Sequence, residues 1–368
     1  MDFKTISYNN ADQPEFVKEL RKRINLYFKE NNISKYGNTS MIMKTIAMLG
    51  MYLIPYFLII FNVSDNPWII LGLWIIMALG MTGIGFSIMH DANHGAYSKN
   101  QKVNKYLGYL INLVGGSAIN WKIQHNVLHH TYTNVHEHDE DIDSGGLMRL
   151  SFHQKRYKLH RLQHIYAWFL YGLLTISWLI KKDFLQLNRY KQKDLIKTQG
   201  ISYLKAYWRL VGAKLFYVAY MILLPLLFSS QSWWLTVIFF LVMHYISSLI
   251  LSTVFQAAHV VGETTFPLPN DNGKINDNFV IHQLKTTANF AKRNRLLSWY
   301  VGGLNFQIEH HLFPNICHVH YRKLSNIVSK TAKEYNIPYH SGKSFLSALY
   351  SHGKLLKQLG KYDFDTVS

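Results

Sequence analysis

Long apolar runs divide the chain into two pairs of segments. In the first pair, "TIAMLGMYLIPYFLIIFNV" and "WIILGLWIIMALGMTGIGFSI" are joined by the turn "SDNP". In the second pair, "LFYVAYMILLPLLF" and "WWLTVIFFLVMHYISSLILSTVF" flank the uncharged turn "SSQS". About 20 apolar residues are enough for a helix to cross a bilayer. The pattern predicts an all-α membrane protein whose four transmembrane helices form two hairpins, at about 43–63, 68–88, 211–228 and 233–255.

Positive charge is confined to one side of these predicted spans. All 39 Lys and Arg residues lie outside two windows, Thr45–Ser98 and Leu215–Gly273. The positive-inside rule then places both short turns outside, and both termini and the segment between the hairpins in the cytoplasm. Lys214 stands at the start of the third span, where its amine can snorkel to the interface. The net charge of +18 could also suit nucleic acid, but its placement beside apolar spans favours a membrane protein.

The rest of the chain predicts a helical cytoplasmic cap. Two apolar stretches within it, "YLGYLINLVGGSA" and "LQHIYAWFLYGLLTISWLI", are broken by glycines or flanked by basic residues, so we expect them to lie at the interface without spanning. The alternative is that all these helices are buried in a large soluble core, but their length favours a membrane. The expected organisation is an N-terminal amphipathic helix region at 1–42, a membrane domain at 43–320 with its cap at 100–213 and 260–320, and C-terminal cap helices at 321–368.

Eight of the 19 histidines form short-spaced groups beside the predicted membrane exits. A helical spacing of four places two side chains on one face, and the next residue is rotated to the neighbouring face. In "HNVLHH", this predicts that His125 and His129 share a face and that His130 points beside them. A lone helical histidine is usually structural, but groups repeated at one membrane depth favour metal ligation. The groups are His90 and His94, then His125, His129 and His130, then His259, and finally His310 and His311.

Eight imidazoles are more than one mononuclear site can use. Two metal ions with about four nitrogen ligands each would use them all, so a dinuclear centre is the natural count. The single cysteine, Cys317, excludes a thiolate cluster. Imidazole binds iron, copper, zinc and nickel, so these residues alone do not name the metal.

Three motifs resemble the histidine boxes of the integral-membrane fatty acid desaturases: "HDANHGAYS", "HNVLHHTYTN" and "GGLNFQIEHHLFP". The glutamine that opens the third box, and the phrase "FQAAHV", resemble the front-end branch, of the linoleoyl-CoA or delta-six type. The likeness runs from about Thr45 to Pro314. It implies a di-iron centre that uses O2 to introduce a cis double bond into an acyl chain. The ligands it implies are His90, His94, His125, His129, His130, His259, Gln307, His310 and His311.

Carboxylates near the boxes have expected roles of their own. Asp91 and Glu309 lie inside boxes, where a carboxylate could accept the second ring N–H of a ligating histidine. The acidic run after the second box is either a solvated loop or a source of the same support through Asp139 or Asp143. Gln307 offers only an amide, so it is either an oxygen ligand or a hydrogen-bond partner of one.

The resemblance also implies partners. Many front-end desaturases carry a fused cytochrome b5 domain with a "HPGG" haem motif, which is missing here, so we expect electrons from ferredoxin or a separate cytochrome b5. The expected substrate is a fatty acyl-CoA or an acyl-lipid, held in an apolar tunnel for which Trp121, Trp299 and Tyr300 are candidate walls. In a prokaryote, the membrane would be the bacterial inner membrane.

Two other functions compete with desaturation. A hydroxylase or ketolase could use the same metal centre, because the same oxidant can deliver oxygen instead of removing a second hydrogen. A metal transporter would need ionisable residues along its spans, and apart from His244 the predicted spans have almost none. We expect His244 to face the interior of the helix bundle.

Overall fold

The fold is described from a computed structural model, which defines residues 5–362. Within that range the chain is helical, with four strands of two residues each. It forms two compact units. Unit 1 comprises Asn38–Ile123 and Trp168–Ser252, and unit 2 comprises the described residues of Phe3–Gly37, Gln124–Ala167 and Thr253–Ser368.

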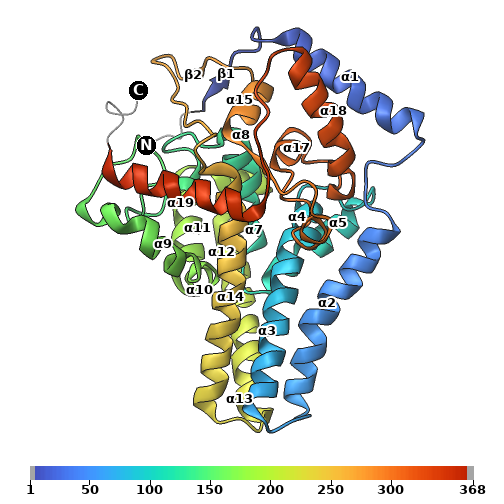
Figure 1. The fold of residues 1–368 in the computed structure, drawn as a ribbon. Helices are drawn as coiled ribbons and strands as arrows, with labels where there is room; N and C mark the ends of the chain where they lie inside the picture. The colour runs from blue at the N-terminus through green and yellow to red at the C-terminus, as the bar shows by residue number, and fades with distance from the viewer. Residues whose placement is uncertain (1–4, 363–368) are drawn as a thin grey trace. The chain divides into compact units, whose positions relative to one another are not determined.

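Unit 1 contains the long apolar helices. Helices α2 (Thr39–Ile60) and α3 (Pro67–Gly83) lie side by side (Figure 1). A π-helical turn, η1 (Ile84–Met89), joins α3 to α4 (His90–Asn93). The second pair is α12 (Tyr203–Val218), continued by η7 (Ala219–Leu223) and α13 (Leu224–Phe228), and α14 (Trp233–His259).

Four stretches of the described chain are long and apolar enough to cross a membrane, which confirms the prediction of four spans in two hairpins. They are Thr39–Ile60, Pro67–Asn93, Tyr203–Phe228 and Trp233–His259. The third begins at Tyr203, earlier than the predicted start near 211. The Ser202 hydroxyl accepts the Lys205 N–H and so caps the helix. Lys205 and Arg209 lie in its first two turns. Because they are charged, the apolar pattern of the sequence did not include these turns in the span.

The two apolar stretches that we expected not to span the membrane form only short, broken helices, and neither is among the four candidate spans. The first holds α5 (Gln101–Gly108), α6 (Leu110–Leu113) and α7 (Ala118–Trp121). The break after α6 needs glycine, because Gly115 has a φ of +86° and a Cβ there would lie 3.1 Å from the Tyr217 ring. The second stretch holds α9 (Gln163–Tyr171), α10 (Leu174–Ser177) and η5 (Trp178–Lys182), and α11 (Asp183–Gln192) and η6 (Leu195–Gln199) follow it.

Lys214 does not snorkel to the interface. Its amine is buried, where it forms an ion pair with Asp183 and donates a hydrogen bond to the Gly115 carbonyl at 2.7 Å. An isolated buried ammonium is costly, whereas one with a carboxylate and a carbonyl as partners is compensated. The sequence pattern missed this because Asp183 lies far from Lys214 along the chain.

His244 faces the interior of unit 1, as predicted. Its Nδ1 lies 2.7 Å from the Thr175 hydroxyl, and its Nε2 lies 2.8 Å from the Tyr217 hydroxyl. Both ring nitrogens are therefore satisfied by protein groups, and this histidine is a structural residue of the bundle.

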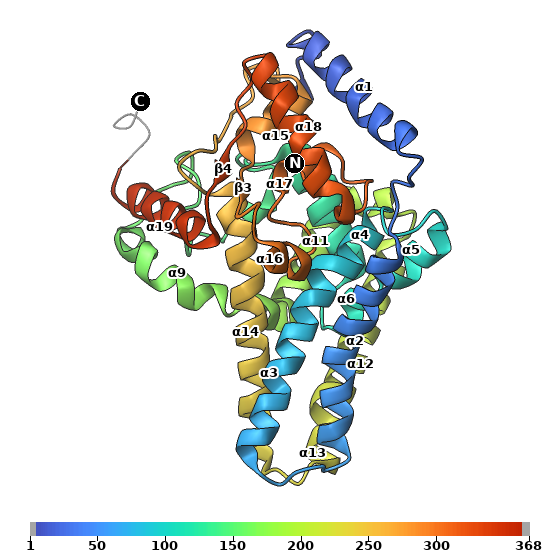
Figure 2. The ribbon, with the colours of Figure 1, turned by 45° about the vertical axis from the view of Figure 1, so that its right-hand side comes forward.

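Unit 2 has a helical core. Helix α1 (Pro14–Glu30) packs on α18 (Tyr321–Glu334) through its buried residues Phe16, Leu20 and Ile24, and it lies within the region expected to hold an amphipathic helix. Figure 2 shows α15 (Phe279–Thr286), α17 (Gln307–Leu312) and α18 grouped in this unit. Helices α16 (Arg295–Tyr300) and α19 (Phe345–Lys361) complete it. Two parallel pairs of short strands tie distant segments together: β1 (Ser7–Tyr8) with β2 (Lys274–Ile275), and β3 (Asn289–Phe290) with β4 (Ser341–Gly342).

Replacing Leu20 with alanine should destabilise unit 2. The Leu20 side chain is 1% exposed and belongs to the core shared with α18. Such truncations leave a cavity and cost about 2–5 kcal/mol. Leu26→Ala, on the same helix but 38% exposed, is the matched control. Equal denaturant midpoints for the two variants would contradict the packing described here.

Candidate metal centre

The second histidine group lies on a π-helical segment, η2 (Lys122–His129), followed by α8 (His130–Tyr132). In a π-helix the hydrogen bonds run between residues five apart, so residues i and i+5 share a face. His125 and His130 accordingly meet, with their Nε2 atoms 3.2 Å apart. His125 also stacks on His129, with ring centroids 5.4 Å apart, as their spacing of four predicts. The π-helix therefore corrects only the expectation that His130 would point to a neighbouring face.

Three histidines from two other segments of unit 2 converge on this group. The Nε2 atoms of His130 and His310 are 2.9 Å apart, and the ring centroids of His130 and His311 are 4.3 Å apart. Both His310 and His311 belong to α17. The third contributor is His259, at the end of α14, whose ring centroid lies 4.7 Å from that of His129 and 4.8 Å from that of His311.

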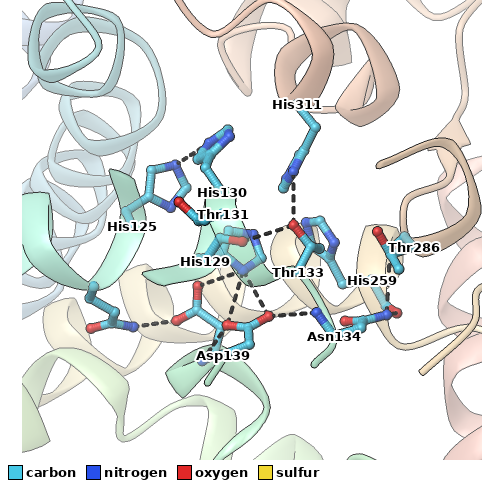
Figure 3. A network of polar contacts seen from close by, with 12 residues as sticks. His125, His129, His130, Thr131, Thr133, Asn134, Asp139, His259, Thr286 and His311 are labelled. Atoms are coloured by element: carbon cyan, nitrogen blue, oxygen red, sulfur yellow. Dashed lines mark hydrogen bonds and ion pairs between the residues drawn. The ribbon is translucent and has the colours of Figure 1, made fainter. Parts of the chain in front are cut away.

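Two overlapping triads have donor atoms close enough to share an ion. They are His129, His259 and His311, and His130, His310 and His311, and within each the donor atoms all lie within 4.8 Å of one another. Figure 3 shows His129, His259 and His311 around a common space, with Asp139 on the far side of His129. The described part of unit 2 therefore gathers six of the predicted ligands: His125, His129, His130, His259, His310 and His311.

Hydrogen bonds at Nδ1 fix the orientation of three of these rings. His129 Nδ1 donates to the Asp139 carboxylate, with oxygens at 3.0 and 3.1 Å. His311 Nδ1 donates to Gln283 Oε1 at 2.8 Å, and His310 Nδ1 lies 3.2 Å from the Tyr321 hydroxyl. A carboxylate and an amide oxygen can only accept, so both rings carry a proton on Nδ1. The neutral His311 ring presents a lone pair at Nε2, and His129 would present one when a metal ion displaces its Nε2 proton.

The partners of these rings are themselves held. Asp139 is buried and accepts backbone N–H groups from Asn134 and Asp141, both at 2.9 Å. The Gln283 amide nitrogen donates to the His130 carbonyl at 3.1 Å, which fixes which end of the amide faces His311. The support is therefore rigid on both sides of the cluster.

The electrostatics of the cluster favour a cation. Burial opposes a charged His129 ring, but the carboxylates of Asp139 and Asp141 outweigh it and raise the pKa of His129 to about 9. For His311, burial and the surrounding imidazoles lower the pKa well below its usual value, so this ring is neutral. A metal ion bound at Nε2 would meet neutral donors and a nearby negative charge.

Unpaired ring nitrogens in the cluster also indicate that these histidines can hold a metal ion. The Nε2 atoms of His129 and His311 are buried without a hydrogen-bond partner among residues 5–362. A buried polar atom left unpaired costs free energy, which a coordinated cation would recover.

The first histidine group lies in unit 1. Its rings, His90 and His94, have centroids 4.8 Å apart, and both contact the Trp121 ring edge-on, at 5.5 and 5.7 Å. Asp91 places a carboxylate oxygen 3.8 Å from His90 Nδ1. The π-helical turn η1 directly precedes this pair. The second group likewise lies on a π-helical segment, η2.

The remaining predicted residues of the third box lie in unit 2. Gln307 is fully buried at the start of α17, and neither its amide nitrogen nor its amide oxygen has a hydrogen-bond partner within residues 5–362. Glu309 is also buried and accepts hydrogen bonds from Asn289 at 2.8 Å and Tyr339 at 2.9 Å. Burial raises the pKa of Glu309 to about 7. Trp299 and Tyr300 lie on α16.

The acidic run after the second box divides between two environments. Asp139 supports His129 from a buried position, while Asp143 is exposed and accepts the Gly145 N–H. Asp141 lies between them, with an oxygen 3.4 Å from His129 Nδ1.

Comparison with known proteins identifies the family. The family model described as fatty acid desaturase matches residues 66–343, which is most of the chain. The chain belongs to the fatty acid desaturase family. An sn-1 linoleoyl-lipid 6-desaturase of Synechocystis sp. is 35% identical over 351 residues, covering 94% of this chain and 96% of the relative. A protein of the same name from Arthrospira platensis is 36% identical over 346 residues, with 94% and 92% covered.

A third relative has a longer chain. It is an acyl-lipid (8-3)-desaturase of Physcomitrium patens, 35% identical over 366 residues, which cover 98% of this chain and 75% of the relative. The desaturase described here is thus an integral-membrane oxidoreductase that acts on fatty acyl chains, and its histidine cluster can hold metal. The hydroxylase and transporter alternatives are not favoured by these relatives.

Sequence reasoning missed Gln283 and Tyr321. The only signal for Gln283 was a polar "HQ" pair within the apolar stretch "FVIHQL" of α15. Tyr321 was recognised as the start of an amphipathic helix but not as a partner of His310. Both act on histidines that are distant in the sequence, so spacing could not reveal them.

Asp139→Asn should weaken metal binding by the desaturase about tenfold to a hundredfold, the usual cost of losing the partner that orients a metal-ligating histidine. Asp143→Asn, in the same acidic run but exposed, is the matched control and should bind metal like the unmodified protein. Competition between purified protein and a coloured chelator for Fe²⁺ measures both affinities. Equal affinity in the two variants would show that Asp139 does not support the site.

Proposed function

We propose that the desaturase holds two iron ions in its histidine cluster and uses O2 to insert a cis double bond into an acyl chain of a membrane lipid, at a front-end position. Two hydrogen atoms leave adjacent methylenes, and O2 is reduced to two water molecules with two electrons from a donor protein and two protons. The observation that carries the proposal is the convergence of six imidazoles in unit 2, with Nε2 lone pairs directed to a shared space.

The proposed ligand set includes the whole of the three histidine boxes. In unit 2 we assign His125, His129, His130, His259, His310 and His311. We further assign His90 and His94, on the strength of their box spacing and their family resemblance. Gln307 is proposed as an oxygen ligand, because its buried amide has no hydrogen-bond partner among residues 5–362.

Iron in such a nitrogen-rich site supplies the oxidising power that an unactivated methylene requires. The residues of the chain position the donors and keep water away. Asp139, Gln283 and Tyr321 each hold one ring by its Nδ1 atom, so that Nε2 faces inward. The burial of the cluster excludes solvent from the reacting atoms. In the first box, Asp91 is close enough to His90 to influence its orientation.

An acyl-lipid is the proposed substrate, in preference to an acyl-CoA. The relatives from Synechocystis sp. and Physcomitrium patens are both named as lipid desaturases and cover nearly all of this chain. Electrons are proposed to come from ferredoxin or a separate cytochrome b5. The distribution of Lys and Arg supports an active site on the cytoplasmic side of the membrane, which in a prokaryote would be the inner membrane.

Expression in a desaturase-poor bacterial host, with linoleic acid in the medium and a ferredoxin and its reductase co-expressed, tests this function. We expect a new polyunsaturated acid in the glycerolipid fraction, with its added double bond on the carboxyl side of the existing ones. Gas chromatography–mass spectrometry of derivatised lipid and acyl-CoA fractions gives the position of that bond and the carrier.

His129→Ala and His310→Ala should abolish the product, and Asp143→Asn should retain it. A hydroxylated acid in place of the unsaturated one would contradict the proposed reaction. A product confined to the acyl-CoA fraction at early times would contradict the proposed carrier.

A further inference from the structure

Two adjoining cavities in unit 1 share one wall near the start of α12. The first has a volume of about 690 Å³ and the second about 490 Å³. Their common wall consists of Lys105, Tyr109, Ala118, Ile119 and Arg209. We propose that these cavities form a binding site for an anionic phospholipid, with the headgroup phosphate in the first cavity and an acyl chain in the second.

The first cavity is strongly basic. Lys105 from α5, Lys122 from the start of η2, and Lys205 and Arg209 from α12 all line it. The described lining contains no Asp or Glu, and none of these four cations forms an ion pair with a carboxylate within residues 5–362. Structural cations in this protein, such as Lys214 and Lys285, do have carboxylate partners. The basic cavity therefore differs from a set of charges that stabilises the fold.

Converging cations without counter-charges repel one another. Burial lowers the pKa of the Lys122 amine, and the positive charge of Lys105 lowers it further. A phosphate diester would relieve it, because its oxygens accept charge-assisted hydrogen bonds from lysine and arginine. Gln101 and Gln199 also line the cavity and add amide donors for headgroup hydroxyls or phosphate oxygens.

The second cavity gives the ligand an apolar part. Outside the shared wall, α12 lines it with Leu210, Ala213 and Phe216, which follow one another along one face of that helix. The polar residues Asn112 and Ser117 complete its lining. This helix begins the third membrane span, so the cavity runs from the headgroup level toward the hydrocarbon. A soluble phosphate would fill only the basic end, whereas a phospholipid matches both ends.

The position of α12 supports a membrane lipid as the source of the phosphate. Leu204 and Trp208 each directly precede one of the basic residues of α12, Lys205 and Arg209, and are 64% and 63% exposed. Tryptophan is enriched where a span meets the headgroups. Lysine and arginine at this level attract anionic lipids. Figure 2 shows α12 in unit 1, with its start at the end of the span where α5 and α6 lie.

The site requires no desaturation chemistry. One of the predicted ligands, His94, also lines the first cavity, so a bound headgroup would lie in the same cavity as the first histidine box. Binding can nevertheless be measured without turnover, and a failure of the lipid proposal leaves the proposed reaction untouched.

Native mass spectrometry of the full chain in a mild detergent tests the site with phosphatidylglycerol as the probe. We expect one tightly held lipid per chain. Lys205→Gln combined with Arg209→Gln should raise its dissociation constant about tenfold or more, because charge-assisted contacts to phosphate are lost. Lys102→Gln is the matched control, because Lys102 is exposed on α5 and does not line either cavity.

Ala213→Trp narrows the second cavity. It should weaken the binding of phosphatidylglycerol without removing any positive charge. Circular dichroism and thermal unfolding establish that each variant is folded before its affinity is compared. Displacement of the lipid by coenzyme A or glycerol 3-phosphate at lower concentration than by phosphatidylglycerol would overturn the lipid assignment. Unsaturable lipid binding, or equal affinity in the double variant and Lys102→Gln, would overturn the site itself.

Discussion

Each clustered imidazole in unit 2 has two ring nitrogens, and the site depends on giving the two different roles. Where Nδ1 donates to Asp139 or to Gln283 Oε1, a proton is fixed on that nitrogen and Nε2 is the atom left to bind a metal ion. The inward Nε2 atoms of His129 and His311 then lack partners among the described residues. That arrangement is unfavourable for a bare protein and favourable for one that binds a cation. The backbone around the site is shaped to maintain it.

The π-helical segment η2 is the main device for doing so. An ordinary helix would have paired His125 with His129 and turned His130 aside. In the wider π turn His125 meets His130 and also stacks on His129, which in turn faces His259 and Asp139. One short segment can then serve both triads of the cluster. A less stable backbone geometry is retained because it distributes three neighbouring histidines in two directions.

The sequence predicted the spans, the ligand types and their grouping, because these depend on local pattern. Apolar length marked the four helices, and repeated histidine spacing marked the second and third boxes. Three-dimensional partners could not be found in the same way. Gln283 supports His311 from a separate helix, and Asp183 neutralises Lys214 across the unit 1 core, although neither pair has any recognisable spacing. Asp139 and Asp143 were equivalent in the sequence, and only burial separates them.

Unit 1 shows two different treatments of charge near a membrane. Lys214 is buried with Asp183, and His244 with Thr175 and Tyr217, so these polar groups are satisfied by the protein and leave an apolar surface for lipid. Lys105, Lys122, Lys205 and Arg209 are gathered around a cavity with no carboxylate in its described lining. Stability alone would favour dispersing or pairing such cations, because repulsion between them opposes folding. Their shared cavity, continued by an apolar wall along α12, is better explained by an anionic amphiphile that completes the charge balance from outside the chain.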